Sequence, residues 1–171
     1  IAGGSVKVLG VGDRALQGDA AFIEVLKLMG CTTRTTDRSL EVTSSGSLHG
    51  IEIDMADMSD LVPTLAVVAA FADSPTRITG VGFIRHKESD RIGDLVNGLK
   101  MVGCDAVEED DGILIRPVHE SQMHGAELLT HDDHRLAMAW SLLALRISGI
   151  VINDPEVVSK SWPEWWDVRS S

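Results

Sequence analysis

The stretch Leu61-Val62-Pro63-Thr64-Leu65-Ala66-Val67-Val68-Ala69-Ala70-Phe71 is apolar at every position except Thr64. A helix that is apolar around its whole circumference is buried on all sides. A similar apolar helix pattern returns over residues 136–145. Two such helices in one chain predict a fold that has its helices inside and its sheets outside.

Sequence motifs on either side of this stretch recur at a nearly constant spacing. Leu9-Gly10-Val11-Gly12 resembles Thr79-Gly80-Val81-Gly82, and Leu28-Met29-Gly30-Cys31 resembles Met101-Val102-Gly103-Cys104 after a slightly longer interval. Self-similarity at a nearly fixed period is typical of stacked copies of one supersecondary unit. Small loop insertions would account for the drift in spacing.

Each copy is predicted to contain one amphipathic helix, several short strands and one buried helix. Gly30 is well suited to end the first amphipathic helix. The chain therefore holds about two and a third β-α-β-β-β-α units, and we expect a single α/β domain over residues 1–171. The predicted strands cover residues 5–9, 32–36, 39–44, 50–55, 76–78, 105–109, 112–117, 126–129 and 150–152, and the predicted helices cover 19–29, 61–71, 88–102 and 133–147.

The composition is that of a globular protein, with 44% hydrophobic and 24% charged residues. The net charge of −11 argues against a nucleic-acid partner, because binding to a phosphate backbone usually needs a basic face. No apolar run reaches the length of a membrane span, and the first residues show no signal peptide. Two cysteines, Cys31 and Cys104, form no disulfide framework and indicate a reducing, cytoplasmic setting.

Charged residues are densest over Arg85-His86-Lys87-Glu88-Ser89-Asp90-Arg91, where a strand and a turn lead into the helix predicted over 88–102. Lys87 and Arg91 are four residues apart and are predicted to share one face of the first helical turn. Cations at this position oppose the helix dipole, so they indicate an anion bound by side chains and free amides together. The alternative is a solvated helix start in which Glu88 and Asp90 pair with the cations.

A second cluster, His131-Asp132-Asp133-His134-Arg135, directly precedes an apolar helix. Asp133 is a plausible N-cap, which would place His134 and Arg135 in the first turn. A metal site is the alternative, because His and Asp are both metal ligands. Sequential residues cannot all converge on one ion and no other cluster supplies ligands, so we expect no metal.

The repeat predicts that these clusters meet in space. Lys87 and Lys160 follow equivalent strands of successive units, and Asp60 and Asp133 both precede the buried helix of their unit. Equivalent turns of a pseudo-symmetric domain converge on one end, although taken singly Lys160 could be a surface lysine and Asp60 an N-cap. The side chains expected to share one cleft are Asp60, Lys87, Arg91, Arg135 and Lys160.

Several motifs together resemble the 5-enolpyruvylshikimate-3-phosphate (EPSP) synthase family. The combination is specific, and the resemblance runs nearly from end to end of the chain. The motifs that carry it are Lys87-Glu88-Ser89-Asp90-Arg91, Asp133-His134-Arg135-Leu136-Ala137-Met138-Ala139, Asp154-Pro155 with Val158-Ser159-Lys160-Ser161-Trp162-Pro163, Gly3-Gly4 with Gln17-Gly18-Asp19, and Asp57-Met58-Ser59-Asp60.

The resemblance implies an inside-out α/β barrel, in which repeated βαβαββ units surround buried helices. It also implies a two-domain protein, a monomer at full length, in which residues 1–171 form most of the C-terminal domain and the N-terminal domain is absent here. The family transfers the enolpyruvyl group of phosphoenolpyruvate to the 5-hydroxyl of shikimate 3-phosphate and releases phosphate. It uses no metal and no organic cofactor, and the chain alone is expected to be inactive.

The resemblance also assigns roles to individual residues. Asp60 would hold the shikimate hydroxyls and act as base, Glu88 would donate a proton, and Lys87 would bridge the two substrates. The assignment of acid and base among these three residues stays open. The groups implied to bind substrate are Asp60, Lys87, Arg91, His134, Arg135 and Lys160.

One position departs from the family pattern. Some members carry an Asn four residues before the motif lysine, where this sequence has Phe83, which cannot make the same hydrogen bond. Two other interpretations stay open beside the transferase. One is a non-catalytic domain that binds an anion or a protein partner, and the other is a relative of the UDP-N-acetylglucosamine enolpyruvyl transferases.

Overall fold

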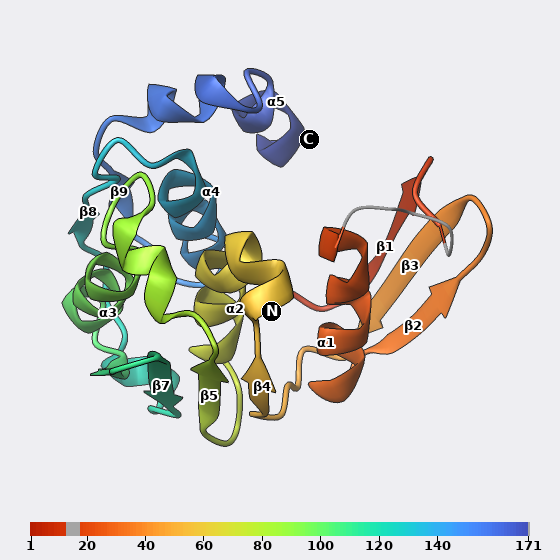
Figure 1. Ribbon diagram of the computed structural model, residues 1–171, viewed down its shortest axis with the longest axis horizontal. Helices are drawn as coiled ribbons and strands as arrows, with labels where there is room; N and C mark the ends of the chain where they lie inside the picture. Colours follow the sequence, from red (N-terminus) through yellow and green to blue (C-terminus); the bar gives the residue numbers. More distant parts are fainter. Residues whose placement is uncertain (13–17, 171) are drawn as a thin grey trace.

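The first repeat unit forms a three-stranded antiparallel sheet with one helix packed against it (Figure 1). The computed structural model describes residues 1–12 and 18–170. Strands β1 (Gly4–Leu9), β2 (Thr32–Thr35) and β3 (Ser39–Ser44) lie in the order β1-β3-β2. Helix α1 (Phe22–Leu28) follows the short 3-10 helix η1 (Gly18–Ala21) and contacts both β2 and β3.

The second unit repeats this strand order within a larger sheet. Strands β5 (Thr76–Thr79), β6 (Asp105–Glu109) and β7 (Gly112–Arg116) lie in the order β5-β7-β6, and each neighbouring pair is antiparallel. Strand β4 (Glu52–Asp54) extends the sheet by pairing in parallel with β5. The shared order confirms that the two segments are copies of one unit, as the spacing of the sequence motifs predicted.

A third, shorter sheet consists of β8 (Glu127–Leu128) and β9 (Val151–Ile152), which pair in parallel. Its β9 continues the pattern seen in β5, because each of these strands follows a buried helix. This agrees with the prediction of a partial third unit.

The two helices expected to be buried lie side by side at the centre of the molecule (Figure 1). In α2 (Val62–Ala69) every residue except Thr64 is buried. The neighbouring α4 (His134–Leu143) buries six of its ten residues, including Trp140. Helix α3 (Arg91–Met101) packs against β6 and covers the second sheet. The prediction of helices inside and sheets outside is therefore confirmed.

Short helices connect these elements and end the chain. The 3-10 helix η2 (Ala56–Leu61) leads into α2, η3 (Gly82–His86) precedes α3, and η4 (Glu120–Gln122) precedes β8. After β9 the chain forms η5 (Pro155–Lys160) and then α5 (Trp165–Ser170).

Two equivalent glycines end the amphipathic helices. Gly30 has φ of 99° after α1, and Gly103 has φ of 86° after α3. At each position the following Cys amide donates to a carbonyl five residues earlier, Cys31 to Leu26 and Cys104 to Leu99. This is the left-handed cap that favours glycine, so the expectation for Gly30 is confirmed.

Some helix boundaries differ from those predicted. The helix expected over 88–102 begins only at Arg91, because Asp90 has non-helical backbone angles and its carboxylate accepts the amide of Gly93. Lys87 therefore lies ahead of α3, and the prediction that it shares a helical face with Arg91 was wrong. Other differences include the start of α1 at Phe22, after a 3-10 turn, the end of α2 at Ala69 and the end of α4 at Leu143.

Among residues 1–12 and 18–170, no helix is both long enough and apolar enough to cross a membrane.

Candidate active site

Three separate chain segments bring charged side chains together at the N-terminal ends of α2, α3 and α4. Asp60 lies in η2, just before α2, and Lys87 follows η3. Arg91 is the first residue of α3, while Arg135 is the second residue of α4. We call Asp60, Lys87, Glu88, Arg91, Asp133 and Arg135 the Asp60 cluster.

The carboxylate of Asp60 is the point on which three cations converge. Its Oδ1 lies 2.5 Å from Nζ of Lys87 and 3.0 Å from Nη1 of Arg91. Its Oδ2 lies 2.8 Å from Nη2 of Arg135, which also donates through Nη1 to the Asp60 carbonyl at 3.2 Å. Lys87 further donates to Oγ of Ser59 at 3.1 Å. Asp60 does not cap α2, because the cap position is Leu61 and no side-chain cap bond forms there.

Arg91 anchors the cluster from below the surface. Its side chain is completely buried, and its Nε lies 2.7 Å from Oδ2 of the equally buried Asp133. Its Nη2 donates to Oε2 of the half-exposed Glu88 at 2.6 Å. Asp133 also accepts the backbone amide of Arg135 at 2.8 Å, which confirms its predicted role as the N-cap of α4. A buried charge needs such partners, because burial removes its hydration and only ion pairs and hydrogen bonds can offset that cost in free energy.

Lys160, at the end of η5, does not contact Asp60. Its Nζ lies 2.6 Å from Oδ1 of Asp132 and donates to the Asp132 carbonyl at 2.9 Å. Asp132 directly precedes the cap residue of α4, so Lys160 is held at the same helix end that carries Arg135. The structure thus joins Lys160 to this end of the fold but through a different carboxylate.

His134 and Phe83 border the cluster without joining its ion pairs. Nδ1 of His134, the first residue of α4, is buried and has no hydrogen-bond partner among the described residues. Burial and the charge of Arg135 keep the pKa of His134 below its usual value, although Asp133 opposes the shift. The ring centroid of the half-exposed Phe83 lies 5.8 Å from Nζ of Lys87, within range of a cation–π contact.

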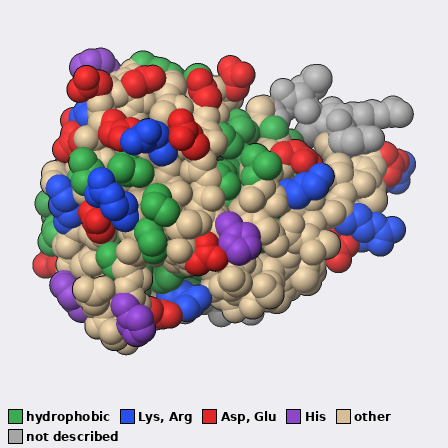
Figure 2. Space-filling model, turned by 90° about the horizontal axis from the view of Figure 1, so that it is seen from below, with side chains coloured by type: hydrophobic (Ala, Val, Ile, Leu, Met, Phe, Trp, Pro, Cys, Tyr) green, Lys and Arg blue, Asp and Glu red, His purple; other side chains and the backbone are tan. Residues whose placement is uncertain are grey.

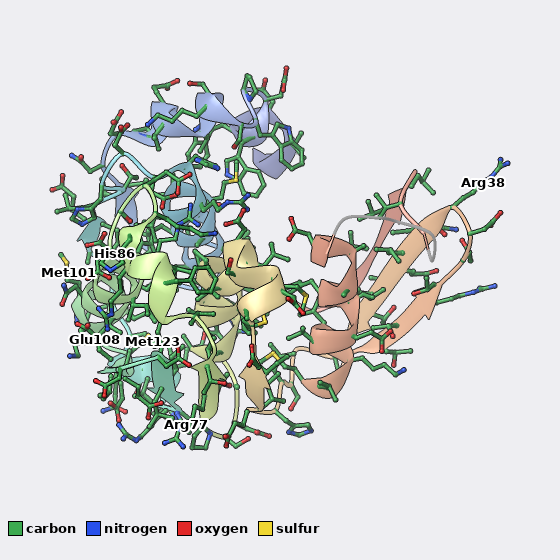
Figure 3. All side chains as sticks on the ribbon, viewed as in Figure 1. Arg38, Arg77, His86, Met101, Glu108 and Met123 are labelled. Atoms are coloured by element: carbon green, nitrogen blue, oxygen red, sulfur yellow. The ribbon has the colours of Figure 1, made fainter. Side chains whose placement is uncertain are left out.

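The ion pairs of the Asp60 cluster and of Lys160 contain equal numbers of cations and carboxylates. Four cations, Lys87, Arg91, Arg135 and Lys160, face four carboxylates, those of Asp60, Glu88, Asp132 and Asp133. Acidic and basic side chains are also interspersed on the face drawn in Figure 2. Other cations lie well apart, such as Arg38 at the tip of the β2–β3 hairpin and Arg77 on β5 (Figure 3).

The electrostatics keep these groups ionised. Partial burial by itself raises the pKa of Asp60, but the hydrogen bond from Lys87 and the charges of Arg135 and Lys87 outweigh it, so the pKa lies below its ordinary value. Burial likewise opposes ionisation of Arg91, and the hydrogen bond and charge of Asp133 reverse the effect and raise its pKa. Asp60 is therefore an anion near neutral pH that could orient hydroxyl groups.

Sequence reasoning found the cations of the site but missed two of their partners. It expected Asp60, Lys87, Arg91 and Arg135 in one cluster, and the distances place these four side chains in contact. It treated Asp133 only as a helix cap and gave Asp132 no role. The repeat could have identified Asp132. Lys160 follows Lys87 by the same interval at which Asp132 follows Ser59, and Ser59 contacts Lys87. The repeat therefore predicts that Asp132 contacts Lys160.

Within the described part of the chain, no group of three or more His, Cys, Asp and Glu side chains is arranged to hold a metal ion. The carboxylates at the helix ends face cations instead. Side chains of these types can bind anions, orient hydroxyl groups and transfer protons.

A family model described as EPSP synthase (3-phosphoshikimate 1-carboxyvinyltransferase) matches residues 1–168. The chain belongs to the EPSP synthase family. A 3-phosphoshikimate 1-carboxyvinyltransferase of Methanosphaerula palustris is 45% identical over 99% of the chain, and one of Nostoc punctiforme is 42% identical over 97%. The chain spans only 39% and 38% of these EPSP synthase relatives.

Two solved structures share the fold. An EPSP synthase structure from Acinetobacter baumannii superposes with a TM-score of 0.85 at 32% identity, over 98% of this chain and 41% of that one. The enolpyruvyl transferase NikO of Streptomyces tendae gives a TM-score of 0.68 at 19% identity, over 95% and 37% of the two chains. That second likeness concerns the fold alone. The fold is therefore the inside-out α/β barrel that the sequence motifs implied.

Proposed function

We propose that this chain acts as the C-terminal domain of a two-domain 3-phosphoshikimate 1-carboxyvinyltransferase. In this role it transfers the enolpyruvyl group of phosphoenolpyruvate to the 5-hydroxyl of shikimate 3-phosphate and releases phosphate. The observation that carries the proposal is the convergence of Lys87, Arg91 and Arg135 on Asp60. Family membership and the shared fold support the same reaction class.

The arrangement of cations suits a substrate rich in negative charge. Phosphoenolpyruvate carries a carboxylate and a phosphate, and guanidinium groups bind both in a bidentate manner. Arg135 and Lys160 would take these groups at the end of α4. Arg91 is buried and held by Asp133, so it would present a fixed charge rather than a mobile one.

Proton transfers accompany both steps of the proposed reaction, addition and elimination. When the substrate oxygen attacks the central carbon of phosphoenolpyruvate, the hydroxyl proton leaves and the methylene carbon gains a proton, giving a tetrahedral adduct. Elimination then returns a proton from the methyl group and expels phosphate. Asp60, Glu88 and Lys87, which belong to the Asp60 cluster, are the groups that would carry these protons.

The lowered pKa of Asp60 bears on its proposed role. A carboxylate that is stabilised by three cations is a weaker base than a free one. Asp60 therefore serves first to align the shikimate hydroxyls, and it becomes basic enough to take a proton only when substrate anions draw the cations away from it.

Charge balance argues for a contribution from a second domain. The four cations of this end of the fold already face four carboxylates, while both substrates are highly anionic. The relatives are about two and a half times as long as this chain. We infer that cations of an N-terminal domain complete the site. Steady-state assays should therefore show no turnover by the chain alone and restored turnover when the N-terminal domain is added.

A substitution of Lys87 tests the site in the full-length protein. Lys87→Met should lower kcat/KM for phosphoenolpyruvate by about a hundredfold or more, the cost of removing one charged donor to a developing transition state. Lys27→Met is the matched control, because Lys27 forms an exposed ion pair with Glu24 on α1, outside the cluster. Equal activity of the Lys87 variant and the control would overturn the proposal.

The same assay separates the remaining functions. A full-length protein that binds phosphate esters in calorimetry without transferring an enolpyruvyl group would be a binding domain. A protein that accepts only a nucleotide sugar as the second substrate would belong with the UDP-N-acetylglucosamine enolpyruvyl transferases.

A further inference from the structure

The contact between Lys160 and Asp132 is more exposed than the ion pairs of the Asp60 cluster. Asp132 contributes both its carboxylate, 2.6 Å from Nζ, and its own carbonyl, 2.9 Å from Nζ. Both side chains are open to solvent, with exposed fractions of 46% for Lys160 and 76% for Asp132. Arg91 and Asp133, by contrast, are completely buried. The Lys160–Asp132 pair can therefore open without exposing a buried charge.

The turn that carries Asp132 has an unusual backbone. His131 and Asp132 have φ of 50° and 60°, and the amide of Asp133 donates to the carbonyl of Thr130 at 2.8 Å. Two successive non-glycine residues with positive φ are uncommon and are retained where the surrounding contacts determine them. One such contact is between His131 and Asp94, whose Nε2 and Oδ1 atoms lie 3.4 Å apart. The backbone thus turns the carbonyl and the carboxylate of Asp132 toward Lys160.

The preceding repeat unit provides an internal comparison. Lys87 is the equivalent of Lys160, and it contacts Ser59, the equivalent of Asp132, at 3.1 Å. The hydroxyl of Ser59 is neutral, and the carboxylate that Lys87 contacts is that of the next residue, Asp60, at 2.5 Å. Asp132 therefore places a carboxylate at a position where the preceding unit has an uncharged side chain, while Asp133, the equivalent of Asp60, pairs with Arg91.

We propose that Asp132 is an internal counterion of Lys160, which the substrate anion must displace in order to bind this lysine. By competing with the anion for Lys160, Asp132 weakens anion binding. The inference rests on the proposed function, in which Lys160 binds phosphoenolpyruvate. Asp132 acts through Lys160 and does not touch the reacting atoms, so it sets affinity rather than rate. Because exposed ion pairs are weak, the need to displace Asp132 lowers the affinity for phosphoenolpyruvate by only a small factor.

Asp132→Asn in the full-length protein tests this role. Asn keeps the size of the side chain and tolerates positive φ, so the turn should be retained. We expect the KM for phosphoenolpyruvate to fall about two- to fivefold, the range that an exposed ion pair supports, with kcat and the KM for shikimate 3-phosphate unchanged. Asp132→Gly, which removes the carboxylate and accepts positive φ, should give the same result and provides a second variant if the first fails to fold.

Asp105→Asn is the matched control. It removes one carboxylate from an exposed pair with Arg116 on the second sheet, with a separation of 3.3 Å and similar exposure, so it changes the net charge equally. Its KM should equal that of the unmodified protein. A KM that is unchanged or raised in both Asp132 variants would overturn the inference, because Asp132 would then be neutral or would position Lys160 for binding.

Lys160→Met distinguishes this failure from failure of the proposed function. If Lys160→Met raises the KM for phosphoenolpyruvate while Asp132→Asn leaves it unchanged, only the counterion role is wrong. If Lys160→Met leaves that KM unchanged as well, Lys160 is not an anion ligand and the proposed site itself is wrong.

Discussion

Arg91 and Asp133 form an ion pair, 2.7 Å from Nε to Oδ2, in which both side chains are completely buried. The pair joins the first residue of α3 to the cap of α4, so it connects the covering helix of one unit to the central helix that follows. Breaking a buried pair by removing one partner is costly, because the other charge stays buried without compensation.

Asp133→Asn should therefore destabilise the protein by about 3 kcal/mol or more. The amide oxygen of Asn can still cap α4, so the loss measures the missing charge rather than the missing cap. Urea unfolding followed by circular dichroism checks this. Asp105→Asn should stay within about 0.5 kcal/mol of the unmodified protein, because its partner Arg116 is exposed. Equal stabilities of the two variants would show that the buried pair contributes nothing.

The stability that Asp60 contributes should depend on pH in a defined direction. Partial burial opposes ionisation of Asp60, but its cationic neighbours lower its folded-state pKa below the unfolded value of about 3.9. Its contribution is present above the unfolded pKa and is lost as the pH falls through the folded pKa. In melting curves between about pH 2 and pH 7, the protein should exceed Asp60→Asn in stability at neutral pH, and the gap should close toward the acid end. A gap independent of pH would contradict the assignment.

Gly98 of α3 should not accept a larger side chain. A Cβ atom there would lie 2.6 Å from Cζ2 of Trp140, the buried tryptophan of α4 whose Nε1 donates to the Leu129 carbonyl. Gly98→Ala should destabilise the protein by about 1–3 kcal/mol through overpacking, despite the better helix propensity of Ala. Asn97→Ala, at the exposed neighbouring position, should be neutral or slightly stabilising. Thermal melting that ranks the two variants in the opposite order would exclude the close contact.

Cys104 should be unreactive in the folded protein. Burial raises the pKa of its thiol to about 11, so only about one molecule in a thousand carries the thiolate at pH 8, and the thiolate is the reactive form. Alkylation followed by mass spectrometry should label Cys104 slowly in the native state and rapidly in denaturant. Rapid native labelling would mean that the end of α3 opens readily.

The apolar patterns and glycine positions were enough to predict the architecture. The uniformly apolar stretch from Leu61 and the paired motifs around Gly30 and Gly103 predicted the buried helices and the repeated units. Helix starts were less predictable. The helix could begin near Lys87 or after a cap at Asp90, and the local sequence pattern does not show which start is more stable. Gln17, part of one resemblance motif, lies outside the described residues.

The charged partners within the site depended on tertiary geometry. Asp133 and Arg91 are 42 positions apart, so no local spacing could pair them. Lys160 was expected near Asp60 from the symmetry of the repeat, but its lysine stem reaches the nearer carboxylate of Asp132 instead. Symmetry therefore predicts which turns meet, whereas side-chain length and the identity of each neighbour decide which atoms touch.

The β2–β3 hairpin carries Arg38 away from the buried helices, with 90% of that side chain exposed. Exposed loop tips of this kind tolerate attachments. A fluorophore linked at this tip would be attached to the first sheet and would leave the Asp60 cluster undisturbed. Its emission could then follow the approach of another domain in real time, without competing for the substrates.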